Sequence, residues 1–244
     1  MKNLKVNIQS IQLIAAFCLM YSVAFSQKEK PKNLPNYDKK LLHFGFSLGI
    51  NSSNSIIKYN PDAMLKDSLL SLEPTRIPGF GLGIVTNFQF ADNFDLRFIP
   101  SLSFLTRQYD YRFCVKCKQT IPTDTLITKT VESTQLDFPL SIKFKSERVN
   151  NYRWYMLAGM KYSMDLASNK DVNTAATFPL RFQKTDLAYE VGLGLDFYLN
   201  YFKFSPELKL SMGTKNMLVK DNTASSNPIQ SLKTKTFYIS FLFE

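Results

Sequence analysis

Few side chains in this sequence could do acid–base, nucleophilic or metal chemistry. His43 is the one histidine among 244 residues, so zinc sites and Ser-His-Asp triads lack their usual groups. Cys114 and Cys117 have C-x-x-C spacing, which supports redox chemistry where a helix begins beside it. A short surface disulfide is the alternative, and we expect it here because the pair follows a strand-like segment. We predict no catalytic, cofactor-binding or metal site.

Charged residues recur instead at alternate positions of apolar segments. Seven acids and seven bases share one face of these segments, which predicts ion pairs rather than a reactive centre. The predicted ion-pair network contains Asp95, Arg97, Asp137, Lys143, Lys161, Asp165, Glu190, Asp196, Glu207 and Lys209. The same face also carries Asp186, Lys145, Arg153 and Lys203.

The elements that position these charges have a period of two, which is typical of strands. The composition is 45% hydrophobic and 14% aromatic, which excludes a disordered chain, and the abundant Phe and Tyr favour strands. About eight strands are predicted, several near the 9–11 residues that cross a bilayer. They lie within residues 42–51, 80–90, 94–104, 136–144, 154–166, 187–199, 204–212 and 237–243.

The connections between these strands alternate between short and long. Short links are expected near residues 91–93, 146–151 and 200–201, and long links at 53–77, 114–127, 169–183 and 214–230. This pattern predicts an all-β fold: an eight-stranded antiparallel transmembrane β-barrel with short periplasmic turns and long extracellular loops. A soluble lipocalin-like barrel has the same strand number but buries its apolar face. An export signal and the long loops favour the membrane barrel.

That export signal occupies residues 1–26. Lys2 and Lys5 precede an apolar stretch, and Ala24-Phe25-Ser26 is a small-x-small cleavage pattern. Residues 27–40 form a Lys-rich arm, and residues 41–244 form the barrel. The arm is either a flexible solvated tail or a periplasmic arm that touches a partner or anionic lipid headgroups.

Two further expectations concern the barrel interior. Pro100, Pro139 and Pro206 fall inside predicted strands, where proline cannot donate to the ladder, so bulges or strand ends are expected there. An eight-stranded barrel is just wide enough for side chains to fill it. Inward-facing ion pairs would therefore leave no room for a polypeptide to pass.

Phrases spread over the mature chain resemble the PorT (SprT) family. They begin with Asn33-Leu-Pro-Asn-Tyr-Asp-Lys-Lys40 and Leu42-His-Phe-Gly-Phe-Ser-Leu-Gly-Ile-Asn51. Further phrases lie in residues 79–83, 94–100, 132–140, 158–168, 189–199 and 201–211. The resemblance implies an outer-membrane barrel needed by type IX protein secretion and gliding motility, with other components of that system as partners. Neither Cys114 nor Cys117 falls in a motif of the family.

The resemblance implies a non-catalytic accessory role, and two other functions stay open. One is a general small outer-membrane barrel for surface binding or small solutes. The other is an outer-membrane enzyme, for which His43 is the only imidazole and no Ser or Asp partner can be assigned. The formal charge of +10 suggests nucleic-acid binding as a further possible function. We reject it because the bases are spread over strands and loops of an exported barrel.

Overall fold

The computed structural model describes residues 31–61, 69–114, 124–166, 182–219 and 226–244. The predicted signal peptide, the arm up to residue 30 and Cys117 lie outside these ranges. Asn33–Glu244 form one compact unit, so residues 33–40 of the predicted arm belong with the barrel. Among the described residues, no helix is long and apolar enough to cross a membrane.

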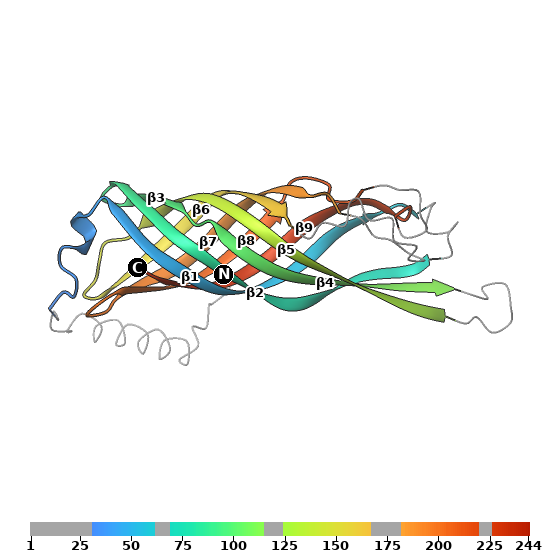
Figure 1. Cartoon of the computed structure of the whole chain (residues 1–244), viewed down its shortest axis with the longest axis horizontal. Helices are drawn as coiled ribbons and strands as arrows, with labels where there is room; N and C mark the ends of the chain where they lie inside the picture. Colours follow the sequence, from blue (N-terminus) through green and yellow to red (C-terminus); the bar gives the residue numbers. More distant parts are fainter. Residues whose placement is uncertain (1–30, 62–68, 115–123, 167–181, 220–225) are drawn as a thin grey trace, which may run out of the picture. The chain divides into compact units, whose positions relative to one another are not determined.

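The described chain folds into one antiparallel sheet that closes on itself (Figure 1). A 3-10 helix, η1 (Tyr37–Lys39), precedes the strands. The strands are β1 (Leu42–Tyr59), β2 (Leu69–Ala91), β3 (Phe94–Phe98), β4 (Ser101–Cys114), β5 (Asp124–Lys145), β6 (Tyr152–Asp165), β7 (Thr185–Tyr198), β8 (Lys203–Gly213) and β9 (Ile229–Phe243).

These nine strands make eight crossings, because β3 and β4 are two parts of one crossing. Both pair with β2 on one side and β5 on the other. The ring closes where β1 pairs with β9, with Phe46 opposite Phe243. The predicted all-β, eight-stranded antiparallel barrel is confirmed.

The two faces of the barrel wall have opposite chemistry. Outward-facing Ile84 and Met156 are 63% and 64% exposed, whereas inward-facing Lys143 and Asp196 are fully buried. A soluble barrel would bury its apolar face, since water is its outer solvent. An apolar exterior around a charged interior requires lipid outside, as expected for a membrane barrel.

Pairing is interrupted on at least one side of all three strand prolines. Pro100 lies in the break between β3 and β4, as predicted, and pairing between β7 and β8 is interrupted beside Pro206. β5 continues through Pro139 in unbroken register with β6, but its pairing with β3 and β4 is interrupted there. The Pro139 carbonyl accepts from the Ile99 amide, so the side without a donor faces the break at Pro100.

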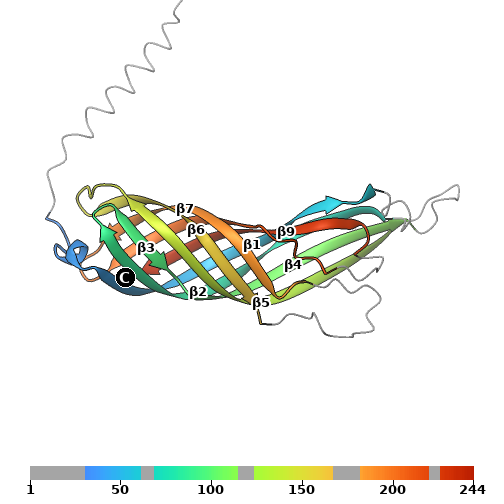
Figure 2. The ribbon, with the colours of Figure 1, turned by 90° about the horizontal axis from the view of Figure 1, so that it is seen from above.

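The two ends of the barrel differ, as Figure 2 shows. The turn end carries the short links at residues 92–93, 146–151 and 199–202, together with η1. The loop end carries the long links, and strands extend further into it than the alternation predicted. β1 runs to Tyr59 instead of ending near residue 51, because β9 pairs with it along residues 46–59.

A second core lies inside the loop end. It is an apolar cluster of buried side chains, not a continuation of the charged interior. The members are Leu69, Leu72, Tyr109, Tyr111, Phe182, Met217, Leu218, Ile229 and Leu232. This cluster stabilises the strand extensions by burying their inner face from water.

Candidate functional site

The interior near the turn end is a network of short ion pairs. Arg97 on β3 bonds Glu207 on β8 at 2.9 Å and Glu244 at 3.2 Å. Lys143 on β5 lies 2.6 Å from Asp196 on β7. All five side chains are almost fully buried. Because each pair joins different strands, the network ties opposite parts of the wall together across the interior.

Four further side chains complete this part of the network. Lys145 lies 2.6 Å from Asp95, and Lys203 lies 2.7 Å from Glu244. Tyr155 donates its hydroxyl to Glu207 at 2.9 Å, and the Lys143 ammonium lies 3.7 Å from the centre of its ring. Charged and aromatic side chains thus fill the cross-section at this level.

Halfway along the barrel the contacts are longer. Lys161 lies 3.8 Å from both Asp137 and Glu190, and Lys209 lies 3.4 Å from Glu190. The buried Glu190 carboxylate has no hydrogen-bond partner in the described protein. A cavity of about 40 Å³ lies here, lined in part by Lys161, Glu190, Lys209 and Tyr238. It has room for a few water molecules, which would satisfy such a carboxylate.

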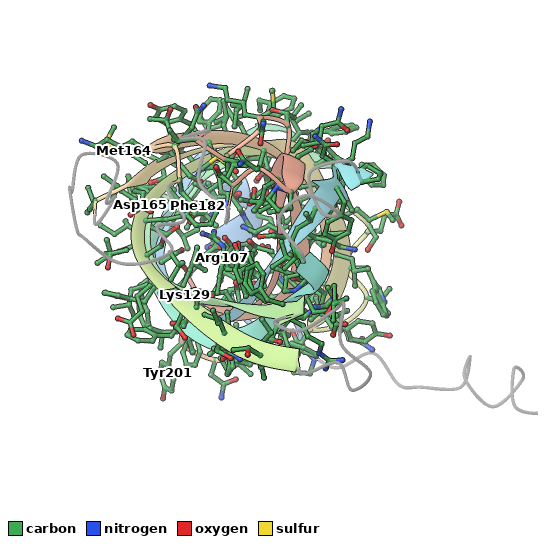
Figure 3. The ribbon with its side chains drawn as sticks, turned by 90° about the vertical axis from the view of Figure 1, so that its right-hand side faces the viewer. Arg107, Lys129, Met164, Asp165, Phe182 and Tyr201 are labelled. Carbon is green, nitrogen blue, oxygen red and sulfur yellow. The ribbon has the colours of Figure 1, made fainter. Side chains whose placement is uncertain are left out.

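Closer to the loop end, two acids accept from hydroxyl groups. Asp165 accepts from Ser133 at 2.8 Å, and Asp186 accepts from Thr234 at 2.5 Å. In Figure 3, which looks in from the loop end, Arg107 and Phe182 lie within the ring whereas Tyr201 lies outside it. The sequence-predicted lumen residues lie inside the barrel at several levels. Lys209, 3.9 Å from Glu207, links the ion pairs near the turn end to those halfway along the barrel.

Arg153 departs from the expected placement among the inner ion pairs. Its guanidinium reaches Asp38, in η1, at 3.3 Å. Two charged residues of the interior were missed. Arg107 donates to Ser53 at 2.9 Å, and its odd-numbered position on β4, on the face of Ser103 and Leu105, could have revealed it. The Glu244 side chain had no such signal, because its position follows the last residue of β9.

Residues 33–40 bind across the turn end, and we call this segment with its contacts the N-terminal clamp. The Asp38 carboxylate accepts from the Tyr198 hydroxyl at 2.9 Å and lies 3.7 Å from Arg148. Arg148 also donates to the Asn33 carbonyl, and the Asn33 side chain donates to the Tyr198 carbonyl at 3.0 Å. Residues 33–40 of the predicted arm are therefore bound to the barrel and are not a free tail.

Tyr37 is the part of the clamp that reaches the interior network. Its hydroxyl donates to Glu244 at 3.0 Å, and its ring stacks on His43 with centroids 4.1 Å apart. Burial, with a smaller contribution from the Glu244 carboxylate, raises the pKa of Tyr37 well above its usual value. The Lys203 ammonium lies 4.7 Å from the centre of the Tyr37 ring.

His43 has a structural environment. Its Nε2 lies 2.8 Å from the Tyr37 carbonyl, so the ring bonds the backbone and stacks on its neighbour. Neither of these contacts is with a Ser or an acid, which is what general-base chemistry would need. Over the described ranges, no group of three His, Cys, Asp or Glu side chains could hold a metal ion.

Only the first cysteine of the C-x-x-C pair is described by the structure, and it lies at the loop end. Cys114 is the last residue of β4, and Cys117 falls outside the described residues. The disulfide between them stays a prediction.

Comparison with known proteins identifies the family. A family model described as "Outer membrane protein beta-barrel domain" matches residues 25–219. No curated protein matches the chain. Among solved structures, OprG from Pseudomonas aeruginosa is 15% identical with a TM-score of 0.43, covering 83% of this chain and 91% of its own.

Two other solved barrels are also similar. Ail, the attachment invasion locus protein of Yersinia pestis, is 12% identical with a TM-score of 0.36, covering 82% of this chain and 96% of its own. Neisserial surface protein A is 10% identical with a TM-score of 0.38, covering 81% of this chain and 95% of its own. The family match, which spans most of the chain, carries the assignment. The chain belongs to the outer membrane protein beta-barrel domain family and is a protein of the outer membrane.

Proposed function

We propose that this protein is a non-catalytic accessory barrel of the type IX secretion apparatus, which also serves gliding motility. The proposal rests on the resemblance of its sequence phrases to the PorT family. One structural observation supports an assembly or supporting role over transport: the barrel is filled along its length. Ion pairs occupy the turn end, a cavity of about 40 Å³ lies midway, and an apolar cluster fills the loop end.

A conduit for secreted protein would need an open interior. An extended polypeptide is wider than any space that the described side chains leave, and opening one would separate buried charges. Breaking a buried pair costs about 3–5 kcal/mol. Several pairs would have to break together, so the cargo must cross elsewhere in the apparatus.

The turn end is then the surface that meets partners. In outer-membrane barrels the short turns face the periplasm. The N-terminal clamp fixes residues 33–40 there and leaves Lys32, Lys39 and Lys40 exposed. Lys28 and Lys30 precede the clamp in the sequence. A basic segment anchored to a rigid barrel suits an acidic partner surface or anionic headgroups.

The proposal is tested by deleting the gene and measuring secretion of type IX cargo. Cargo should accumulate in the periplasm, and normal secretion in the deletion strain would refute the assignment. In a second strain, Lys28, Lys30 and Lys32 are replaced by Gln, which leaves the clamp intact. Secretion should fall while the amount of folded barrel in the outer membrane is unchanged.

A matched control separates the arm from general effects of charge. Lys58→Gln, Arg112→Gln and Lys233→Gln together remove the same charge from exposed positions at the loop end. This variant should secrete normally. Equal loss in both variants would contradict a specific role of the arm, and cargo crosslinked inside the barrel would refute the supporting role.

The alternative, a general small barrel for surface binding, is favoured by one observation. Strands β1, β2, β4 and β5 extend into a loop end with its own apolar core. A role confined to the periplasm does not require this structure. If the deletion strain secretes normally but loses adhesion to surfaces, the alternative replaces the secretion role.

A further inference from the structure

The outer face of the barrel changes from apolar to polar at one level on neighbouring strands. On β1 the outward positions run through Leu48 and Ile50 to Ser52 and Asn54. On β9, Asn54 has Lys235 as its partner, one outward position beyond the apolar Phe237. The edge of the apolar belt marks where hydrocarbon meets lipid headgroups. Asn54 and Lys235 therefore lie at headgroup level.

On the other side of β1, the change occurs at the same level. The β1–β2 register places Ile50 opposite Phe80 and Ser52 opposite Pro78. Phe80 is the aromatic residue of β2 that lies nearest to the loop end. Arg76, the next outward residue of β2, is exposed. The boundary thus brings Arg76 and Lys235 to either side of β1.

The barrel wall opens at this point, because β1 and β2 part. Their ladder ends with Ser53 opposite Ile77, although β1 continues to Tyr59 and β2 begins at Leu69. Beyond this pair β1 is bonded to β9 and β2 to β4. Pro74 and Pro78 deprive β2 of two donors along this stretch.

A side-chain bond takes the place of the missing ladder on β1. The Ser55 amide donates to the Asn54 side chain at 2.8 Å, as a local bond instead of a partner strand. One backbone donor next to the point where β1 and β2 part is therefore satisfied locally.

A depression of about 230 Å³ lies at this place. It is lined by Ser52, Asn54, Arg76, Leu210, Lys235 and Phe237. The set combines two cations, two polar side chains and two apolar ones. In the part of the chain that the structure describes, neither Arg76 nor Lys235 forms an ion pair, in contrast to the paired bases of the interior.

We propose that this depression binds the phosphate group of a phosphorylated lipid in the outer leaflet. Arg76 presents a guanidinium that matches a phosphate bidentately, and Lys235 adds a second positive charge. Ser52 and Asn54 supply neutral donors. Leu210 and Phe237 provide the apolar side on which an acyl chain lies, so the site fits an amphiphile better than a free anion.

The test compares two lipids that differ only in phosphate. The full mature protein, folded in detergent, is mixed with diphosphorylated lipid A or with the same lipid after enzymatic dephosphorylation, and retained lipid is measured by native mass spectrometry. Diphosphorylated lipid A should bind at least tenfold more tightly. The double variant Arg76→Gln, Lys235→Gln should bind diphosphorylated lipid A at least tenfold more weakly than the wild type, because it loses two charge-assisted bonds to phosphate.

The matched control is Lys58→Gln with Arg112→Gln, which removes one Lys and one Arg from exposed positions outside the depression. Its affinity should stay within twofold of the wild type. Arg76→Lys keeps the charge but loses the bidentate guanidinium, and it should weaken lipid binding several-fold. This single variant provides the test if the double variant does not fold. Equal retention of both lipids, unchanged binding by the depression variant, or full competition by millimolar inorganic phosphate would each overturn the proposal.

Discussion

The Tyr37 hydroxyl donates to the Glu244 carboxylate at 3.0 Å, which joins the segment before the first strand to the residue after the last one. Glu244 also receives Lys203 at 2.7 Å and Arg97 at 3.2 Å. The N-terminal clamp is therefore bonded into the interior network and does not merely lie against the turn end. Loss of the clamp should weaken the barrel as well as free the arm.

Tyr37→Phe removes the hydrogen bond to this buried carboxylate while keeping the ring on His43. We expect the free energy of unfolding to fall by about 1.5–3 kcal/mol, the range for bonds to charged groups. Urea unfolding in lipid, followed by the fluorescence of the single tryptophan, Trp154, measures it. Tyr201→Phe is the control, because Tyr201 is 92% exposed. An equal effect of both changes would argue against the clamp.

The raised pKa of Tyr37 predicts a dependence on alkaline pH. A raised pKa in the folded state means that the stabilisation is complete below about pH 10, the ordinary tyrosine value, and is lost as the pH rises further. The difference in unfolding free energy between wild type and Tyr37→Phe should be constant from pH 7 to about 9.5 and narrow above it. A difference that stays constant to pH 11.5 would contradict the buried, bonded phenol.

Lys143 and Asp196 form a buried ion pair in which each charge is stabilised by the other. Lys143→Met leaves the Asp196 charge buried with its closest cation gone, so unfolding free energy should fall by about 3–5 kcal/mol. Adding Asp196→Leu removes the stranded charge and should restore a substantial part of the loss. Urea midpoints of the two single variants and the double variant form the cycle. Additive losses would show that the two side chains are not coupled.

Two glycines of the wall should respond differently to alanine. A Cβ on Gly159 would lie 2.2 Å from the Leu140 carbonyl oxygen and 2.5 Å from the Ser141 Cα, both backbone atoms that β5 holds in place. A Cβ on Gly81 would meet nothing closer than 3.4 Å. Gly159→Ala should fail to give the faster-migrating folded band on unheated gels. Gly81→Ala should fold, and failure of both would point to strand propensity instead of the clash.

The orientation of the barrel is tested by Cys114, the last residue of β4 at the loop end, and by Cys117, which follows it in the sequence. If the clamp is periplasmic, a membrane-impermeant maleimide should label these residues on intact, reduced cells. Labelling without prior reduction would show that no disulfide joins them. Labelling that needs a permeabilised outer membrane would reverse the orientation.

The sequence by itself determined the local pattern of this protein. Alternation of side chains along each strand follows from backbone geometry, so Lys143 and Asp196 could be assigned to one face without knowledge of their partners. The export signal and the long loops indicated that the apolar face meets lipid. Pro100 marked a strand break, because a residue without an amide hydrogen cannot donate to the ladder.

Tertiary structure decided everything that depends on closing the ring. Arg97 meets Glu244 across 147 positions only because the stagger between strands brings both to one level. The same stagger parts β1 from β2 beyond Ser53 and lets β9 extend β1 past its alternating residues. It also brings Asp38 to Tyr198. Register is a property of strand pairs and not of one segment, so such contacts leave no signal in the residues that make them.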